Sequence, residues 1–230
     1  IVGINYNLDI YEAVRKNYPN KCFVASECAA TSSTRGWYLD DCLEKAYLSA
    51  YDKDTNNWFL GREKTHQKLA SLPFVAGWYQ WIGIEHRGEA YWPRICSQAG
   101  AIDLFLQRKD AFYQNKSFWS KEPMIHLLPH WNMEGYPSPV KVWAYTNCEE
   151  AELFLNGKSL GKIKSGRFNH GEWFVPFTKG ELKVVGYIGG KAVVSDKKVT
   201  SKKGTALKLE VMNPEDLTAK DGTVILYRVT

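Results

Sequence analysis

Long apolar runs are missing from this sequence of 230 residues. No stretch approaches the roughly 20 consecutive apolar residues that a membrane-spanning helix needs, so we expect no membrane segment and no membrane partner. The first residues also lack the basic start, the apolar middle and the small-residue cleavage site of a secretory signal. The chain opens directly on an apolar strand pattern, so we expect it to be part of a longer protein.

Cysteine and histidine give no metal-binding pattern. The five cysteines are odd in number and contain no C-x-x-C pair, so we expect buried free thiols. His126 and His130 stand four residues apart, but Pro129 breaks any helix between them. No phosphate-binding loop, dinucleotide fingerprint or G-x-S-x-G serine motif occurs. We therefore expect no metal and no cofactor.

Charge is spread along the chain rather than concentrated. The formal net charge is +5, and its densest lysine group, at residues 197–203, is typical of a solvated surface. We expect no nucleic-acid partner. Aromatic residues, in contrast, are abundant, with nine tryptophans and thirteen tyrosines. Most of these rings should pack in a core, although such rings also stack against the apolar faces of sugars.

The first 120 residues or so alternate strand and helix patterns. Continuous apolar runs suit strands that are buried on both faces of a parallel sheet. Amphipathic patterns between and after these runs predict helices that pack on the sheet. Repeated strand and helix units therefore predict a parallel α/β architecture. The predicted strands are residues 1–6, 22–26 and 74–81, and the predicted helices are residues 9–18 and 101–119.

The pattern changes to β after residue 119. Residues 120–123 resemble a linker, and the segments that follow alternate apolar and polar residues. Asn156-Gly157 between two such segments is a strong signal for a hairpin turn. Short strands separated by Gly and Pro predict an antiparallel sandwich, and the last stretch predicts a further strand pair.

Glu27 follows the apolar run at residues 22–26. A carboxylate at the carboxyl end of a parallel barrel strand is where such barrels place catalytic groups. The residues after it are small and rich in hydroxyls, which predicts a loop that a ligand can approach closely. The alternative is a surface glutamate at the end of a strand.

Two aromatic residues end the neighbouring predicted strands. Tyr6 would lie next to Glu27 in a parallel sheet and could donate a hydrogen bond to its carboxylate, while the alternative is simple packing. Trp81 could form the floor of a sugar subsite by stacking, while the alternative is a core position. Glu85 and Glu89 follow in the next loop, where ion pairs with the nearby arginine are the alternative to a role in binding.

Several stretches resemble glycoside hydrolase family 2, and they occur in the expected order. FVASECAATSSTRGWY resembles the strand and loop in which a Ser-Glu pair supplies the nucleophile. AGWYQWIGIEHRGEAYWP is similar to the last barrel strand and its loop, and GAIDLFLQRKDAFYQNKSFW to the segment that closes the barrel. IHLLPHWNMEG and VWAYTNCEEAELFLNGKSLGK resemble the immunoglobulin-like domain of Bacteroides-type β-galactosidases. The likeness covers nearly the whole chain.

This resemblance implies three parts. Residues 1–122 would be the C-terminal part of a (β/α)8 TIM barrel, in the α/β class. Residues 123–202 would be an immunoglobulin-like β-sandwich. Residues 203–230 would begin a further β domain.

The resemblance also implies roles for four residues. Glu27 would be the catalytic nucleophile of a retaining, exo-acting β-galactosidase, and Tyr6 its hydrogen-bond partner. Trp81 and Glu89 would bind the substrate, a β-linked oligosaccharide or glycoside. Glu85 stands, with the histidine after it, where an Asp-Tyr pair is common in the family. This departure makes the sugar less well determined than the reaction.

Retaining hydrolysis needs a second carboxylate, about 5 Å from the nucleophile, that acts as acid and base. In the family this is a Glu after an Asn on the fourth barrel strand, which would precede Ile1, and no Asn-Glu pair occurs in this chain. We therefore expect the isolated chain to be inactive. We also expect its open strands to pair with the missing N-terminal part of the same enzyme or with another copy in a homo-oligomer.

A different class of function is the main alternative. The chain could be a non-catalytic carbohydrate-binding or scaffolding module in which sandwich aromatics contact the sugar: Trp143, Trp173 or Tyr187. A third possibility is that the later domains only brace the barrel. For localisation, the resemblance favours the periplasm or the exterior.

Overall fold

The computed structural model describes residues 1–39, 42–53, 60–92, 94–202, 204, 206–212 and 227–229. The chain divides into two compact units, Ile1–Val199 and Thr200–Thr230. In the second unit, the described residues include one antiparallel strand pair, β11 (Leu209–Val211) with β12 (Tyr227–Val229). The rest of the β domain predicted at residues 203–230 lies mostly outside the described residues. Among the described residues, no helix is long and apolar enough to cross a membrane.

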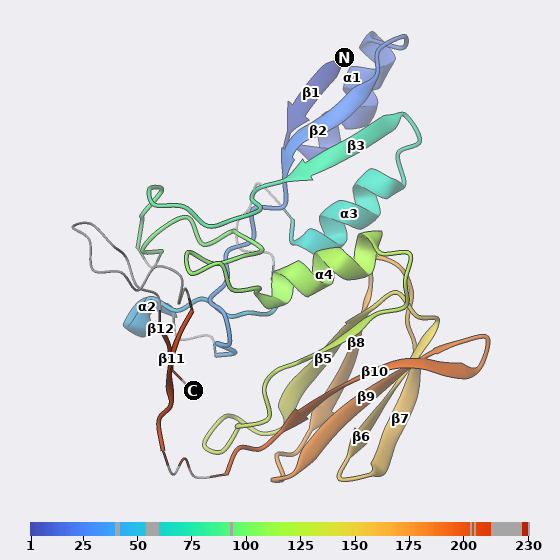
Figure 1. The fold of residues 1–230 in the computed structure, drawn as a ribbon. Helices are drawn as coiled ribbons and strands as arrows, with labels where there is room; N and C mark the ends of the chain where they lie inside the picture. Colours follow the sequence, from blue (N-terminus) through green and yellow to red (C-terminus); the bar gives the residue numbers. More distant parts are fainter. Residues whose placement is uncertain are drawn as a thin grey trace. The chain divides into compact units, whose positions relative to one another are not determined.

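The first unit begins with a parallel sheet in the order β1-β2-β3 (Figure 1). The predicted strands are therefore confirmed, and β2 continues two residues beyond the predicted end, so that Glu27 lies inside the strand. The elements around this sheet are β1 (Val2–Asn5), η1 (Leu8–Ile10), α1 (Tyr11–Asn17), β2 (Phe23–Cys28), α2 (Cys42–Lys45), α3 (Arg62–Ala70) and β3 (Val75–Gln80).

One face of this sheet carries a hydrophobic core. Phe23 and Ala25 alternate along β2 and are fully buried, as the period of two in a strand requires. They pack with Tyr11 of α1 and Leu69 of α3. The prediction of strands buried on both faces is wrong for all three strands in this chain, because Asn5 of β1 and Ser26 of β2 are exposed and Tyr79 of β3 is 69% exposed.

Helix α4 (Asp110–Trp119) is shorter than the helix predicted at residues 101–119. Residues before it form a turn in which the Asp103 carboxylate accepts hydrogen bonds from the amides of Phe105 and Gln107. Leu106 has a φ of 59°, which a helix excludes. Two local hydrogen bonds to the Asp103 side chain therefore override the amphipathic pattern in the first half of the segment.

Helix α3 was not predicted, because its sequence is almost entirely polar. Its buried face is formed by Arg62, Thr65, His66 and Leu69 rather than by an apolar stripe. Arg62 is held by the distant carbonyls of Thr31 and Ala99, and His66 accepts from the indole of Trp78. A hydropathy pattern carries no sign of such a helix.

The remainder of the first unit is a β-sandwich of two antiparallel sheets, in the orders β4-β5-β8 and β10-β9-β6-β7 (Figure 1). This confirms the sandwich predicted after residue 119. Its strands are β4 (Ile125–Leu128), β5 (Val140–Thr146), β6 (Glu150–Leu155), β7 (Lys158–Lys164), β8 (His170–Val175), β9 (Glu181–Ile188) and β10 (Lys191–Val199).

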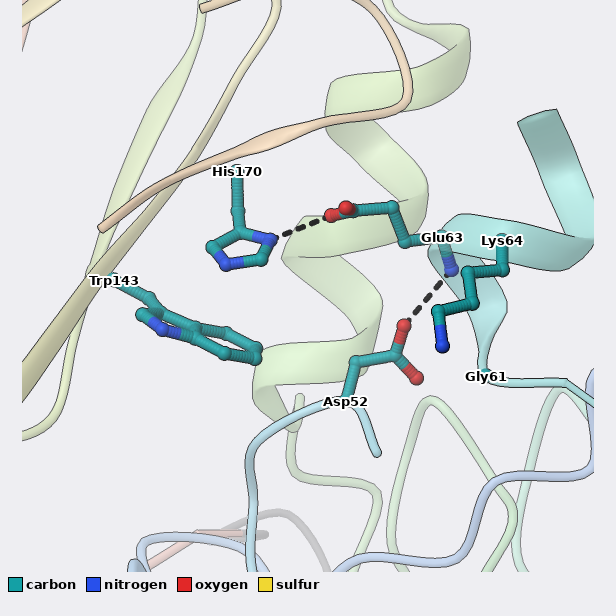
Figure 2. Close-up of a pocket in the computed structure, with 6 residues that line it drawn as sticks. All are labelled: Asp52, Gly61, Glu63, Lys64, Trp143 and His170. Carbon is teal, nitrogen blue, oxygen red and sulfur yellow. Dashed lines mark hydrogen bonds and ion pairs between the residues drawn. The ribbon is translucent and has the colours of Figure 1, made fainter. Parts of the chain in front are cut away.

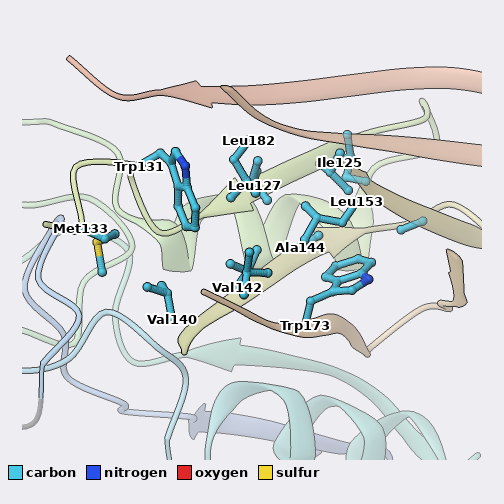
Figure 3. Close-up of a cluster of buried hydrophobic side chains, with 13 residues drawn as sticks. Ile125, Leu127, Trp131, Met133, Val140, Val142, Ala144, Leu153, Trp173 and Leu182 are labelled. Atoms are coloured by element: carbon cyan, nitrogen blue, oxygen red, sulfur yellow. The ribbon is translucent and has the colours of Figure 1, made fainter. Parts of the chain in front are cut away.

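The sandwich core lies between these two sheets (Figure 3). Val142 and Ala144 of β5 face Leu153 of β6 and Leu182 of β9, and all four are fully buried. Trp131 fills one end of the core, and its indole Nε1 donates to the carbonyl of Thr178 at 2.9 Å. Close packing of large side chains from both sheets is what stabilises such a sandwich.

The Asn156-Gly157 hairpin turn predicted between β6 and β7 is confirmed. Asn156 has a φ of 50° and Gly157 a φ of 81°, so both central residues adopt the left-handed conformation of this turn. We expect Gly157→Ala to lower the free energy of unfolding by about 1–2 kcal/mol, because a Cβ is disfavoured in that conformation. Urea unfolding measures the effect. Gly166→Ala, at a position without this constraint, is the control and should change stability by less than about 0.5 kcal/mol.

The prediction of buried thiols is correct for Cys28, Cys96 and Cys148, which are buried and free. It is wrong for Cys22, which is free and exposed. Cys22 directly precedes β2, where the chain enters the sheet from the surface. The side chain of Cys42 lies outside the described residues.

Candidate active site

Glu27 lies near the carboxyl end of β2, beside the end of β1. Asn5 is its register partner, and a bulge interrupts the pairing at this point. The amide of Tyr6 donates to the carbonyl of Glu27 at 2.8 Å, which continues the pairing past the last residue of β1. The parallel order of the two strands therefore brings these three residues to the same edge of the sheet.

The carboxylate of Glu27 accepts hydrogen bonds from two side chains. Asn5 Nδ2 donates to Oε2 at 3.4 Å, and the Tyr6 hydroxyl forms the second bond. Ser26 Oγ donates to Asn5 Oδ1 at 2.8 Å, which turns the Nδ2 of that amide toward Glu27. The predicted Tyr6–Glu27 contact is thus present in the structure. Asn5 was not predicted, although a polar residue at the end of an apolar strand is a signal that could have indicated it.

Ionisation of the neighbouring groups is suppressed. Burial raises the pKa of Tyr6, and the hydrogen bond to Glu27 and its charge raise it further. Burial raises the pKa of the Cys28 thiol to about 12, and the charge of Glu27 adds to this shift. At neutral pH the phenol is therefore a hydrogen-bond donor and the thiol is not a nucleophile. The carboxylate of Glu27 is the acceptor of the Tyr6 hydrogen bond.

Trp81 directly follows β3 and is linked to β2 through its backbone. Its amide donates to the carbonyl of Cys28 at 2.7 Å, and its peptide bond to Ile82 is cis. The indole meets the ring of His86 edge-on, with 5.8 Å between the ring centroids. The residue is partly exposed rather than enclosed in the core. The structure therefore places Trp81 beside the strand end that carries Glu27.

Glu89 belongs to the loop that follows β3. Ser97 Oγ donates to its Oε2 at 2.7 Å, and His86 Nε2 lies 4.0 Å from the same oxygen. Its side chain is 46% exposed. The negative charge of Glu89 contributes to the raised pKa of Tyr6, so its carboxylate lies within electrostatic range of the Glu27 site.

A separate small pocket of about 120 Å³ lies where α3 meets the sandwich (Figure 2). Three of its acidic and histidine side chains are engaged in contacts within the lining. His170 Nδ1 lies 2.6 Å from Glu63 Oε2, and Asp52 accepts from the amide of Glu63 at 2.8 Å. The ring of Trp143 lies 3.8 Å from that of His170. These contacts indicate a structural junction. The lining residues are Asp52, Gly61, Glu63, Lys64, Trp143 and His170.

Of the three sandwich aromatics considered as a sugar platform, the two tryptophans are buried, whereas Tyr187 of β9 is partly exposed. Trp143 is 7% exposed and Trp173 is 8% exposed. The hydroxyl of Tyr187 donates to Glu152 at 2.8 Å, and the ammonium of Lys162 lies 3.7 Å from its ring centroid. Neither indole offers an open face to a sugar. Among the described residues, no group of three or more His, Cys, Asp or Glu side chains is placed to hold a metal ion.

Comparison with known proteins identifies what this chain is similar to. A putative β-glucuronidase of Formosa agariphila is 30% identical over 92% of this chain, which covers 25% of that protein. A β-galactosidase of Bacteroides ovatus is 30% identical over 91% of this chain and 27% of that protein. A family model described as a domain of unknown function, DUF4982, matches residues 138–194.

Solved structures agree with these relatives. A β-glycosidase from Bacteroides vulgatus has a TM-score of 0.79 at 30% identity and covers 91% of this chain and 32% of its own. A glycosyl hydrolase family 2 member from Bacteroides cellulosilyticus has a TM-score of 0.66 at 26% identity, covering 91% of this chain and 26% of its own. The homologues are family 2 glycosidases.

These homologues confirm the resemblance to glycoside hydrolase family 2. They do not confirm that the resemblance is to the β-galactosidases of that family. Relatives named as β-glucuronidases are matched as well as a relative named as a β-galactosidase. The chain spans about a quarter of the length of the curated relatives it matches first, at 25% and 27%.

Proposed function

We propose that this chain is the C-terminal part of a retaining, exo-acting β-glycosidase of family 2, in which Glu27 is the nucleophile. The observation that carries this proposal is the carboxylate of Glu27 near the carboxyl end of a parallel strand, held by hydrogen bonds from Asn5 and Tyr6. The homology of the chain to family 2 glycosidases supports it. The substrate is a β-linked oligosaccharide or glycoside.

The proposed reaction is a double displacement. The carboxylate of Glu27 attacks the anomeric carbon of the terminal sugar, and the bond from that carbon to the glycosidic oxygen breaks. An acid group outside this chain protonates the leaving oxygen. The same group then takes a proton from water, whose oxygen attacks the anomeric carbon and releases Glu27. Tyr6 holds the Glu27 carboxylate in place, and Trp81 and Glu89 contact the sugar.

The proposal also covers the architecture. Strands β1 to β3 would be the last strands of a (β/α)8 barrel, since their order is parallel and a catalytic carboxylate would lie at their carboxyl ends. The exposed Tyr79 and the unpaired outer edges of β1 and β3 would then be covered by the preceding barrel strands. The sandwich at residues 123–202 would be immunoglobulin-like.

Hydrolysis of nitrophenyl glycosides tests the proposed function. The substrates are the β-galactoside and the β-glucuronide, and the proteins are this chain and the extended protein, meaning this chain preceded by the segment that would complete its barrel. We expect turnover by the extended protein and none by the chain alone, because one of the two carboxylates is absent from the chain. Failure of the extended protein on all glycosides would contradict the proposal. Sugar binding by the sandwich would then favour a carbohydrate-binding module.

A further inference from the structure

A buried ion pair lies under the loop that follows β3. Lys109 Nζ lies 2.6 Å from Glu85 Oε1 and donates to the carbonyl of Gln98 at 2.8 Å. The side chains of the ion pair are 1% and 9% exposed. A buried ammonium is costly unless it is paired and hydrogen-bonded, so the folded loop depends on these two contacts.

Lys109 is charged under ordinary conditions. Burial lowers its pKa to about 8, and the carboxylate of Glu85 opposes this shift. Because a pKa of about 8 is above neutral pH, most molecules carry the proton at pH 7. The contact with Glu85 at 2.6 Å thus favours the ammonium form of Lys109.

The two arms of the loop after β3 approach each other closely and are joined by backbone hydrogen bonds. The amide of Glu85 donates to the carbonyl of Ile102 at 2.9 Å, and the amide of Ile102 donates to the carbonyl of Gly83 at 3.0 Å. A Cβ at Gly100 would lie 2.4 Å from the Glu85 amide nitrogen and 2.7 Å from its Cγ. Only glycine fits there, so the two arms of the loop approach each other at the point where Glu85 turns toward Lys109.

The same loop carries the proposed sugar contacts. Trp81 stands at its start, and the amide of Ser97 donates to the carbonyl of His86 at 3.1 Å. The hydroxyl of Ser97 holds Glu89 at 2.7 Å. A shift of the returning arm, which contains Ser97 and Gln98, would therefore move Glu89.

The returning arm is also joined to the loop after β2. The carbonyl of Gln98 that binds Lys109 also accepts from the amide of Ser33 at 3.1 Å. A second buried cation, Arg62, joins the same two segments. It donates to the carbonyl of Ala99 in the returning arm at 3.1 Å and to the carbonyl of Thr31 in the loop after β2. Both loops start at the strand ends that carry Glu27 and Trp81.

We propose that Lys109, paired with Glu85, is a positioning residue that holds the loop after β3 against the loop after β2. It thereby sets the distance between Glu89 and the nucleophile Glu27. The kinetic part of this proposal rests on the proposed function. Lys109 touches no substrate and acts through Glu85 and the carbonyl of Gln98.

Two variants separate positioning from folding. Lys109→Met leaves a buried carboxylate without its partner and should unfold at a lower temperature. The double variant Lys109→Met/Glu85→Gln removes both charges and should recover most of this loss, while the bond to the carbonyl of Gln98 remains absent. In the extended protein we expect kcat/KM of the double variant to fall about 10–100-fold, since small displacements in an active site cost this much. The exposed Lys191→Met is the control and should match the native enzyme.

Hydrogen exchange in the 230-residue chain gives a readout that needs no activity. In the double variant the amides of Glu85, Ile102 and Ser33 should exchange about 10-fold faster or more, while Val142 in the sandwich stays unchanged. Native exchange at these three amides would overturn the proposal, as would native kcat/KM in a folded double variant. If the native extended protein hydrolyses no glycoside, the proposed function fails, and hydrogen exchange still decides whether Lys109 holds the loops together.

Discussion

Replacing Glu27 by Gln in the extended protein should reduce kcat for glycoside hydrolysis on the order of 10⁴-fold or more. Gln is nearly the same size and still accepts a hydrogen bond from Tyr6, so the local structure should persist. Its neutral amide cannot form the glycosyl-enzyme intermediate. Steady-state kinetics with a nitrophenyl glycoside measures the loss, and unfolding temperature shows whether the variant is folded.

Two companion variants sharpen this test. Glu12→Gln removes an exposed carboxylate on α1 and should leave kcat unchanged. Glu27→Ala leaves room for azide, a small external nucleophile that can attack the anomeric carbon in place of the missing carboxylate. We expect azide to restore turnover and to yield a glycosyl azide of inverted configuration. Nearly native hydrolysis by Glu27→Gln would exclude this residue as the nucleophile.

The stability of the sandwich should depend strongly on Trp131. This side chain is fully buried at one end of the core and packs on Phe177 with 5.3 Å between ring centroids. Trp131→Ala should lower the free energy of unfolding by about 3–5 kcal/mol, because it leaves a large cavity. It also removes the indole donor from the carbonyl of Thr178. Urea unfolding followed by circular dichroism measures the change.

Phe174→Ala is the matched control for this prediction. Phe174 is also a sandwich aromatic, but it is 59% exposed on β8. Its truncation should change stability by less than about 0.5 kcal/mol. Equal effects of the two variants would contradict the account in which the core between the two sheets, and not surface aromatic content, stabilises the sandwich.

The strands and their turns were predictable because their signals are local. The apolar run before Glu27 predicts β2, and the Asn156-Gly157 pair predicts its hairpin from the backbone conformations that these two residues tolerate. The first half of the helix predicted at residues 101–119 failed for a local reason as well, since Asp103 binds backbone amides and forms a turn. A period of 3.6 in hydropathy does not register that competition.

The contacts of the candidate site are likewise of two kinds, those that local sequence patterns predict and those that they do not. Glu27 and Tyr6 were predictable because each ends or nearly ends an apolar strand, and parallel strands bring their ends together. The roles of Lys109 and Arg62 were not predictable, because their partners are Glu85 and the carbonyl of Thr31, which lie 24 and 31 residues away. Hydropathy predicts such side chains at the surface.

By itself, then, the sequence determined the strands, the sandwich, the candidate nucleophile and the kinship with family 2 glycosidases, since short-range patterns and motifs carry this information. Only the tertiary structure decided that the polar helix α3 is buried against its neighbours and that two cations lie beneath the candidate site. The physical reason is that a buried charge is stable only with specific partners. Those partners are brought together by the fold and not by their order in the chain.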